Sequence, residues 1–295
     1  MSRTIAIAEE KRRPPTIQLP RIPTAICYKR PLEVRNHETN RIIFGDSDNY
    51  QILELIGRGR YSLVYNAFDS SRRDSCVVKK LLDEDTNRIK RELRYLSILK
   101  RGPNIIRARD VIRLDVVGEK FKYGVVFEKI RNVDFRILYR QFDALEIRYY
   151  LYQLLNALSY AHHQGIMHRD VKPENIVIDP DARNLRLIDW GFGALYLPGQ
   201  AYFCGACTLA YRAPELLLGY RHYDYSMDMW SFACVAAGMM FRRDRFFEGV
   251  DERTQMQIIG RFLGRQMLDD YLQKYHIRSE AAQLVGQEDS MLDSQ

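Results

Sequence analysis

One segment constrains the fold of this 295-residue chain more than any other, namely residues 168–175, which read HRDVKPEN. A second string, DWG at residues 189–191, begins 14 residues after Asn175. Together they hold an acid that can take a hydroxyl proton, a lysine that can hold a phosphate, and an amide and a carboxylate that suit magnesium. These residue types in this order indicate phosphoryl transfer, and such chemistry requires a fold that brings both strings to one site.

Phosphoryl transfer gives each of these residues a role. The protein forms no covalent bond of its own, so catalysis comes from aligning a hydroxyl with the γ-phosphate and from neutralising the developing charge. We expect Asp170 to orient and deprotonate the hydroxyl and Lys172 to steady the γ-phosphate, while Asn175 and Asp189 bind Mg²⁺. In the alternative interpretation, the Asp and the Asn only cap turns of a loop.

Partners for this site lie upstream, which favours the catalytic interpretation. Residues 50–56 and 65–68 read as two strands around a turn whose glycines would let backbone amides approach a triphosphate. The turn alone could be an ordinary hairpin, since Ser62 stands where the third glycine of such a loop is usual. However, Lys79 ends a short apolar strand and Glu92 follows in the helical stretch 87–99, so the two can form an ion pair that directs the ammonium to the α- and β-phosphates. The residues expected to bind the nucleotide are Ile56, Gly57, Arg58, Gly59, Arg60, Tyr61, Ser62, Val64, Val77, Lys79, Phe127, Glu128, Ile130 and Ile188.

The pattern along the chain predicts an α+β protein with two lobes. Residues 46–130 alternate strand-like runs with one helix and end in a connector, whereas residues 131–278 are mostly helical. We expect the nucleotide between the lobes, with the backbone of residues 127–130 facing the adenine. A core helix that ends at Gly165 is predicted from an apolar stripe at helical spacing, formed by Ile147, Leu151, Leu154, Leu155 and Leu158.

Charge separates the two ends from these lobes. Residues 1–45 form a basic extension with nine Lys or Arg against four acids, and residues 279–295 form an acidic tail with four acids and no base. Solvated tails are the expectation, although a basic end could also bind nucleic acid, which would make DNA affinity strongly salt-dependent. Nucleic acid is not an expected partner.

Cysteine usage and hydropathy bear on location. Five cysteines without a disulfide-like framework favour a reducing compartment, cytoplasmic or nuclear. The apolar run 232–241 is too short to cross a bilayer, so no membrane partner is expected. Residues 1–15 have no long apolar core, so no signal peptide is expected. Cys204 and Cys207 have metal-site spacing, but with no second pair nearby we expect two small loop residues.

Over residues 30–276 the chain resembles the catalytic alpha subunits of casein kinase II. The likeness is carried by GRGRYS at 57–62, GIMHRDVKP at 165–173, LRLIDWG at 185–191 and YDYSMDMWS at 223–231, with Trp190 where most kinases have Phe. The resemblance implies a bilobal protein kinase fold and a serine/threonine kinase that uses Mg-ATP, or also GTP, and is active without loop phosphorylation. It further implies acidic protein substrates and a regulatory beta subunit as partner.

Several positions depart from that family. Residues 83–85 are DED where the family has lysines, and Gly205 and Leu209 replace two basic residues that hold acidic substrates. Arg91, Arg169 and Arg212 remain as the expected substrate-binding residues. We therefore expect a weakened acidic preference.

The last departure concerns the C-terminal part. Asp228 is expected to anchor the backbone of the catalytic loop, but the match fades after residue 276, so the sequence predicts a helical lobe without its last helices. The arginine that would pair with Glu215 is then missing. This leaves open a second interpretation, a truncated pseudokinase that acts as a binding or decoy subunit.

Overall fold

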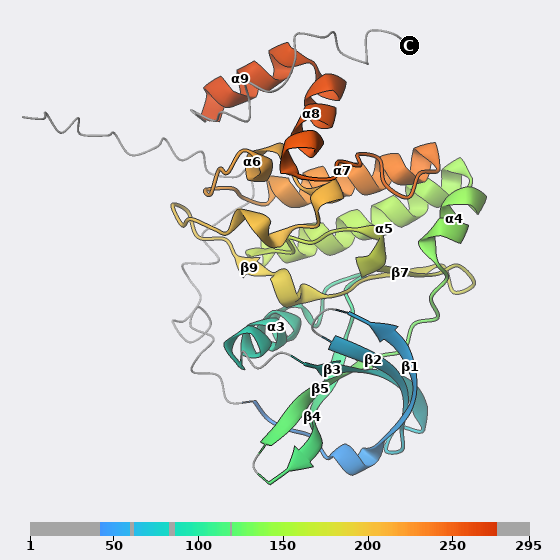
Figure 1. Cartoon of the computed structure of the whole chain (residues 1–295). Helices are drawn as coiled ribbons and strands as arrows, with labels where there is room; N and C mark the ends of the chain where they lie inside the picture. Colours follow the sequence, from blue (N-terminus) through green and yellow to red (C-terminus); the bar gives the residue numbers. More distant parts are fainter. Residues whose placement is uncertain (1–41, 60–61, 83–85, 119, 276–295) are drawn as a thin grey trace, which may run out of the picture.

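The computed structural model describes residues 42–59, 62–82, 86–118 and 120–275. Figure 1 shows two lobes, a sheet with one helix beside it and a larger part built mainly of helices. The predicted α+β, two-lobed architecture is thus confirmed. The basic extension through residue 41 and the acidic tail lie outside the described residues, so the expectations for them stay predictions.

The smaller lobe is one antiparallel sheet with the strand order β1-β2-β3-β5-β4. Its small core cluster lies on one face and consists of Ala67, Cys76, Val78, Ile112 and Val126. The strands are β1 (Tyr50–Arg58), β2 (Ser62–Asp69), β3 (Asp74–Leu81), β4 (Ala108–Val117) and β5 (Lys120–Glu128). Since side chains alternate along a strand, Val77 and Lys79 face away from this cluster, toward the larger lobe's core.

Helix α3 (Thr86–Leu99) packs on that second face of the sheet and corresponds to the predicted helical stretch 87–99. Its buried residues recur at helical spacing, which gives the helix one inward stripe. The stripe consists of Ile89, Glu92, Tyr95, Leu96 and Leu99. A carboxylate in an otherwise apolar stripe requires a partner, and its partner is described below.

The larger lobe is helical around a few short strand pairs. Its helices are α4 (Phe135–Gln141), α5 (Ala144–His163), α6 (Pro214–Leu217), α7 (Ser226–Phe241), α8 (Glu252–Leu263) and α9 (Arg265–Tyr275). Strands β6 (Ile166–Met167) and β9 (Ala194–Leu195) form one pair, and β7 (Ile176–Asp179) and β8 (Asn184–Leu187) form another. The loops between these short strands carry both sequence strings.

Helix α5 confirms the predicted core helix and refines its stripe. Asp143 and Glu146 close a capping box at its start, and Gly165 follows its end with a φ of 78°, a conformation that favours glycine. Leu154 and Leu158 are fully buried, but Leu155 is 36% exposed. Adjacent residues on a helix point about 100° apart, so one apolar stripe cannot bury both Leu154 and Leu155 equally.

Helix α7 contains the apolar run 232–241 and packs against α5. Eight of its 16 residues are buried, whereas Met240 and Phe241 at its end are exposed. Among the described residues, no helix combines the length and the apolar character that crossing a bilayer demands.

Candidate active site

The catalytic loop is anchored by a carboxylate at the start of α7. Asp228 is completely buried and accepts hydrogen bonds from the backbone N–H groups of His168 and Arg169, each at 2.8 Å. Its Oδ2 also lies 2.9 Å from Nε2 of His162 on α5. Burial alone would raise the pKa of Asp228, but these hydrogen bonds and the nearby imidazoles hold it below its ordinary value. The predicted anchor is therefore in place.

Both oxygens of the Asp170 carboxylate are engaged by neighbours. Oδ1 accepts hydrogen bonds from the backbone N–H and the hydroxyl of Thr208, at 3.1 and 2.7 Å. Oδ2 lies 2.8 Å from Nζ of Lys172 and 3.1 Å from the amide nitrogen of Asn175. Lys172 also donates to the Thr208 hydroxyl at 2.9 Å. Three of the sequence-predicted residues are thus assembled around one carboxylate, with Thr208 as a fourth member.

Thr208 was not predicted from the sequence. A signal was present, however, because it is the only Ser or Thr between Asp189 and Pro214. Its position in the chain does not reveal the contact, which joins residues 38 apart.

The predicted ion pair between strand and helix is formed. Nζ of Lys79 on β3 lies 2.9 Å from Oε1 of Glu92 on α3 and 2.9 Å from Oδ1 of Asp189. Burial would lower the pKa of Lys79, but the two carboxylates raise it above its usual range, and the same ammonium outweighs burial to lower the pKa of Asp189. Lys79 is therefore a fixed cation between the two lobes, and the Asp189 side chain remains 39% exposed.

The donor set fits a hydrated magnesium ion. The amide nitrogen of Asn175 donates to the Asp170 backbone oxygen at 2.8 Å and to its carboxylate, so the amide oxygen points the other way and is available as a ligand. A backbone hydrogen bond from Ile188 N–H to the Asn175 carbonyl, 2.9 Å long, keeps Asn175 next to the segment that carries Asp189. Across the described residues there is no group of three or more His, Cys, Asp or Glu that could hold a metal. An ion held by Asn175 and Asp189 would thus complete its shell with phosphate and water oxygens, as Mg²⁺ commonly does.

The residues predicted to bind the nucleotide lie mainly on the sheet and in the connector. Val77 pairs with Phe127 and Lys79 with Val125, which puts these four side chains on one face. Phe127 is buried, and Ile130 and Ile188 pack partly buried against the same core. Arg60 and Tyr61 lie outside the described residues. The remaining predicted residues lie on β1, on β2 or directly after β1, namely Ile56, Gly57, Arg58, Gly59, Ser62 and Val64.

The connector is tied to the larger lobe through a side chain. Oε1 of Glu128 accepts hydrogen bonds from Nε of Arg186 on β8 at 3.0 Å and from the backbone N–H of Arg107 at 3.1 Å. The backbone N–H of Glu128 in turn donates to the Arg107 carbonyl at 3.1 Å, so both the side chain and the N–H of Glu128 are engaged by the protein.

Two of the three predicted substrate-binding arginines are engaged within the chain. Arg169 donates from Nε to the Phe192 carbonyl at 2.7 Å and from Nη1 to the Tyr223 hydroxyl at 3.1 Å. Arg212 is turned inward to the Cys207 carbonyl and Glu252. Arg91 on α3 has a buried Nε without a hydrogen-bond partner in the part of the chain that the structure describes. Residues 83–85, the acidic departure, lie outside the described residues.

Trp190 and the two loop cysteines complete the site's surroundings. The Trp190 ring is fully buried edge-to-face against His168, with ring centroids 4.6 Å apart, but within the described residues its indole N–H finds no acceptor. Its support of the loop therefore comes from packing.

Cys204 and Cys207 are free cysteines, and burial raises the pKa of both thiols.

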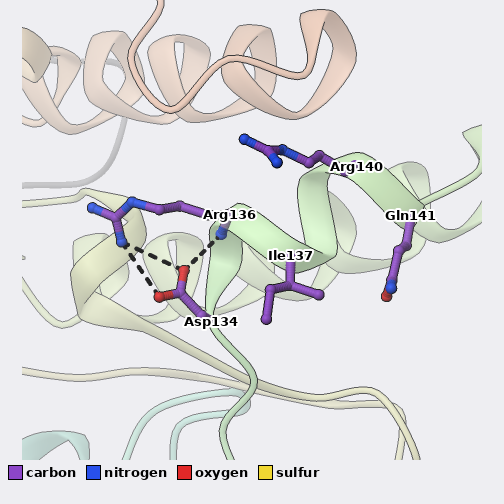
Figure 2. Close-up of a pocket in the computed structure, with 5 residues that line it drawn as sticks. All are labelled: Asp134, Arg136, Ile137, Arg140 and Gln141. Atoms are coloured by element: carbon purple, nitrogen blue, oxygen red, sulfur yellow. Dashed lines mark hydrogen bonds and ion pairs between the residues drawn. The ribbon is translucent and has the colours of Figure 1, made fainter.

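A separate concavity lies on α4. Figure 2 shows Asp134, Arg136, Ile137 and their neighbours around it, with Arg136 turned back to Asp134. None of its lining residues belongs to the site described above.

Comparison with protein families gives one match that spans most of the chain. The model of the protein kinase domain matches residues 50–292. The match includes every residue of the site described above.

Proposed function

Because the chain belongs to the protein kinase family, we propose that it is a serine/threonine kinase that transfers the γ-phosphate of Mg-ATP to protein hydroxyls. The observation that carries the proposal is the cluster of Asp170, Lys172 and Thr208. It joins a carboxylate that can take the hydroxyl proton to an ammonium 2.8 Å away that can hold the phosphate. The position of Lys172, two residues after Asp170, is typical of serine/threonine kinases and supports that choice of hydroxyl.

In the proposed mechanism, Lys79 binds phosphates and Asp170 accepts the hydroxyl proton. Lys79, fixed by Glu92, would bind the α- and β-phosphates. Hydrogen bonds from Thr208 and Asn175 hold the Asp170 carboxylate in the orientation in which it would accept the hydroxyl proton.

Separate residues would bind the metal ion and the γ-phosphate. Asn175 and Asp189 would hold Mg²⁺, which supplies charge neutralisation at the phosphates when it is bound. Lys172 would remain beside the γ-phosphate throughout the transfer.

The resemblance to casein kinase II supports the finer proposals. These are GTP as a second donor, a weakened preference for acidic proteins, a regulatory beta subunit as partner, and a cytoplasmic or nuclear location. Loss of the basic side chains at positions 205 and 209 supports the weakening of the acidic preference.

The test is phosphate transfer from Mg-ATP to a generic Ser/Thr protein by the purified chain, with Asp170→Asn as the silent control. Binding is measured separately, since Mg-ATP at a hundredfold excess over its dissociation constant should stabilise the fold by about 2.7 kcal/mol. Lys79→Met should remove this stabilisation. Stabilisation without transfer would favour the pseudokinase alternative, and absence of both would refute a competent site.

A further inference from the structure

The side chain of Arg212 is held by its own chain. Arg212 follows a short turn, Leu209–Tyr211, and is only 9% exposed. Its Nε and Nη2 donate to the Cys207 carbonyl at 3.1 and 2.7 Å, and its Nη1 bonds to the carboxylate of Glu252. All three guanidinium nitrogens therefore already donate a hydrogen bond.

Glu252 reaches this position from the first turn of α8. Asp251 caps the helix by accepting the N–H of Thr254 at 2.7 Å, which fixes where the next residue projects. The Glu252 side chain is 63% exposed. One oxygen thus meets Arg212 while the carboxylate remains open to solvent on its other side.

The basic charge carried by residues 189–214 themselves depends on that one pair. Between residues 189 and 214, Arg212 is the only Lys or Arg. Gly205 and Leu209, where the resembling family has basic residues, are uncharged here. When Glu252 neutralises it, the segment presents no free cation, and the exposed carboxylate adds a negative charge. An acidic peptide side chain would have to displace an internal carboxylate that is always present at high effective concentration.

The pair also lies close to the proposed chemistry. The carbonyl that holds Arg212 belongs to Cys207, and the next residue, Thr208, donates to Asp170 from both its backbone and its hydroxyl. Peptide residues adjacent to the phosphoacceptor would consequently pass the Arg212–Glu252 pair.

We propose that Glu252 is a specificity-determining residue, which masks Arg212 and so disfavours acidic side chains next to the phosphoacceptor. The proposal rests on the proposed function and names the substrate class of that site: Ser/Thr peptides whose residue next to the phosphoacceptor is neutral or basic, so that the weakened acidic preference concerns more distant positions. Arg212 is the latent anion site that Glu252 occupies.

The test compares two Ser peptides that differ only in Asp or Lys immediately after the phosphoacceptor. The ratio of kcat/KM for the Asp peptide to that for the Lys peptide should rise about tenfold in Glu252→Gln, because a hydrogen bond to a charged group becomes available to the peptide. Glu248→Gln is the matched control. Glu248 is likewise exposed but pairs with Arg245 at 3.3 Å, so its ratio should stay at the wild-type value.

A double variant distinguishes the unmasking of Arg212 from a general change of the electrostatic field around the peptide. Adding Arg212→Gln to Glu252→Gln should cancel the gain for the Asp peptide if Arg212 is the group that binds it. A gain that persists in the double variant, or a ratio that Glu252→Gln leaves unchanged, overturns the proposal.

Peptide affinity provides a readout that does not need catalysis. Fluorescence anisotropy of the two labelled peptides, measured with a non-hydrolysable ATP analogue, should give the same tenfold change in the ratio of dissociation constants. If no variant transfers phosphate, the proposed function fails while the binding ratio still decides the role of Glu252. If neither peptide binds to any variant, the proposal is overturned as well.

Discussion

Glu215 gives a prediction whose size can be worked out from its surroundings. This residue of α6 is 6% exposed, and no basic group of the described residues is among the causes of its pKa shift. The hydroxyl of Tyr271 on α9 donates to its Oε2 at 3.2 Å. Burial raises the pKa of Glu215 from 4.5 to about 7, and Asp224 adds to the rise, whereas the hydrogen bonds from its backbone, Tyr271 and Ser226 oppose it.

The sign of the effect on stability follows from which state binds the proton more tightly. The folded carboxyl holds its proton up to about pH 7, but the unfolded one releases it near 4.5. Stability is therefore fully present below the unfolded pKa and is lost as the pH rises through the folded pKa. One pKa unit is worth about 1.4 kcal/mol, so the full loss is about 3 kcal/mol, of which about 2 kcal/mol falls between roughly pH 5.5 and 8.5.

Glu215→Gln should remove this dependence. Glutamine has nearly the same shape, stays neutral, and can still accept the Tyr271 hydroxyl. Urea unfolding of both proteins should show the variant gaining about 2 kcal/mol relative to wild type between about pH 5.5 and 8.5. Glu248→Gln, on the surface, should show no such gain. A Glu215→Gln difference that is the same at both pH values would refute the reasoning.

Two further predictions concern the catalytic cluster. Thr208→Ala should lower kcat by about tenfold to a hundredfold because Asp170 loses a donor, while Thr208→Ser keeps the hydroxyl and most of the rate; steady-state kinetics decide, and equal rates for both variants would contradict the role of the hydroxyl. Asp189→Asn should lower activity by orders of magnitude while the protein still folds, whereas Trp190→Phe should lower it less than about tenfold, since the indole N–H has no acceptor among the described residues. Undiminished activity of Asp189→Asn would overturn its assignment as a metal ligand.

The sequence predicted the parts of the site that chemistry dictates. Asp170, Lys172 and Asn175 had to be close together because they lie within six residues, and Lys79 and Glu92 could be paired because opposite charges on inward faces need partners. The contact of Lys79 with Asp189 was not predicted. The two-lobed arrangement followed from the change of apolar periodicity from strands to helices.

Long-range partners could not be predicted in this way. Tyr271 meets Glu215 across 56 residues, and Glu252 meets Arg212 across 40. Each contact depends on how α8 and α9 pack, and no local pattern encodes that packing. The prediction that Glu215 lacks its arginine partner therefore did not include the Tyr271 hydroxyl. The prediction that Arg212 binds substrate did not include the Glu252 carboxylate.

The anchor at Asp228 has a consequence for how the catalytic loop opens. The amides of His168 and Arg169 are donors to a carboxylate that belongs to α7 and is shared with His162 of α5. Exchange of these two amides with solvent hydrogen requires their bonds to Asp228 to break, and this carboxylate is buried and bonded to a second helix. Although the amides lie in a loop, we therefore expect them to exchange about as slowly as amides of the two helices, so that fraying of the surrounding strands leaves the catalytic backbone in place.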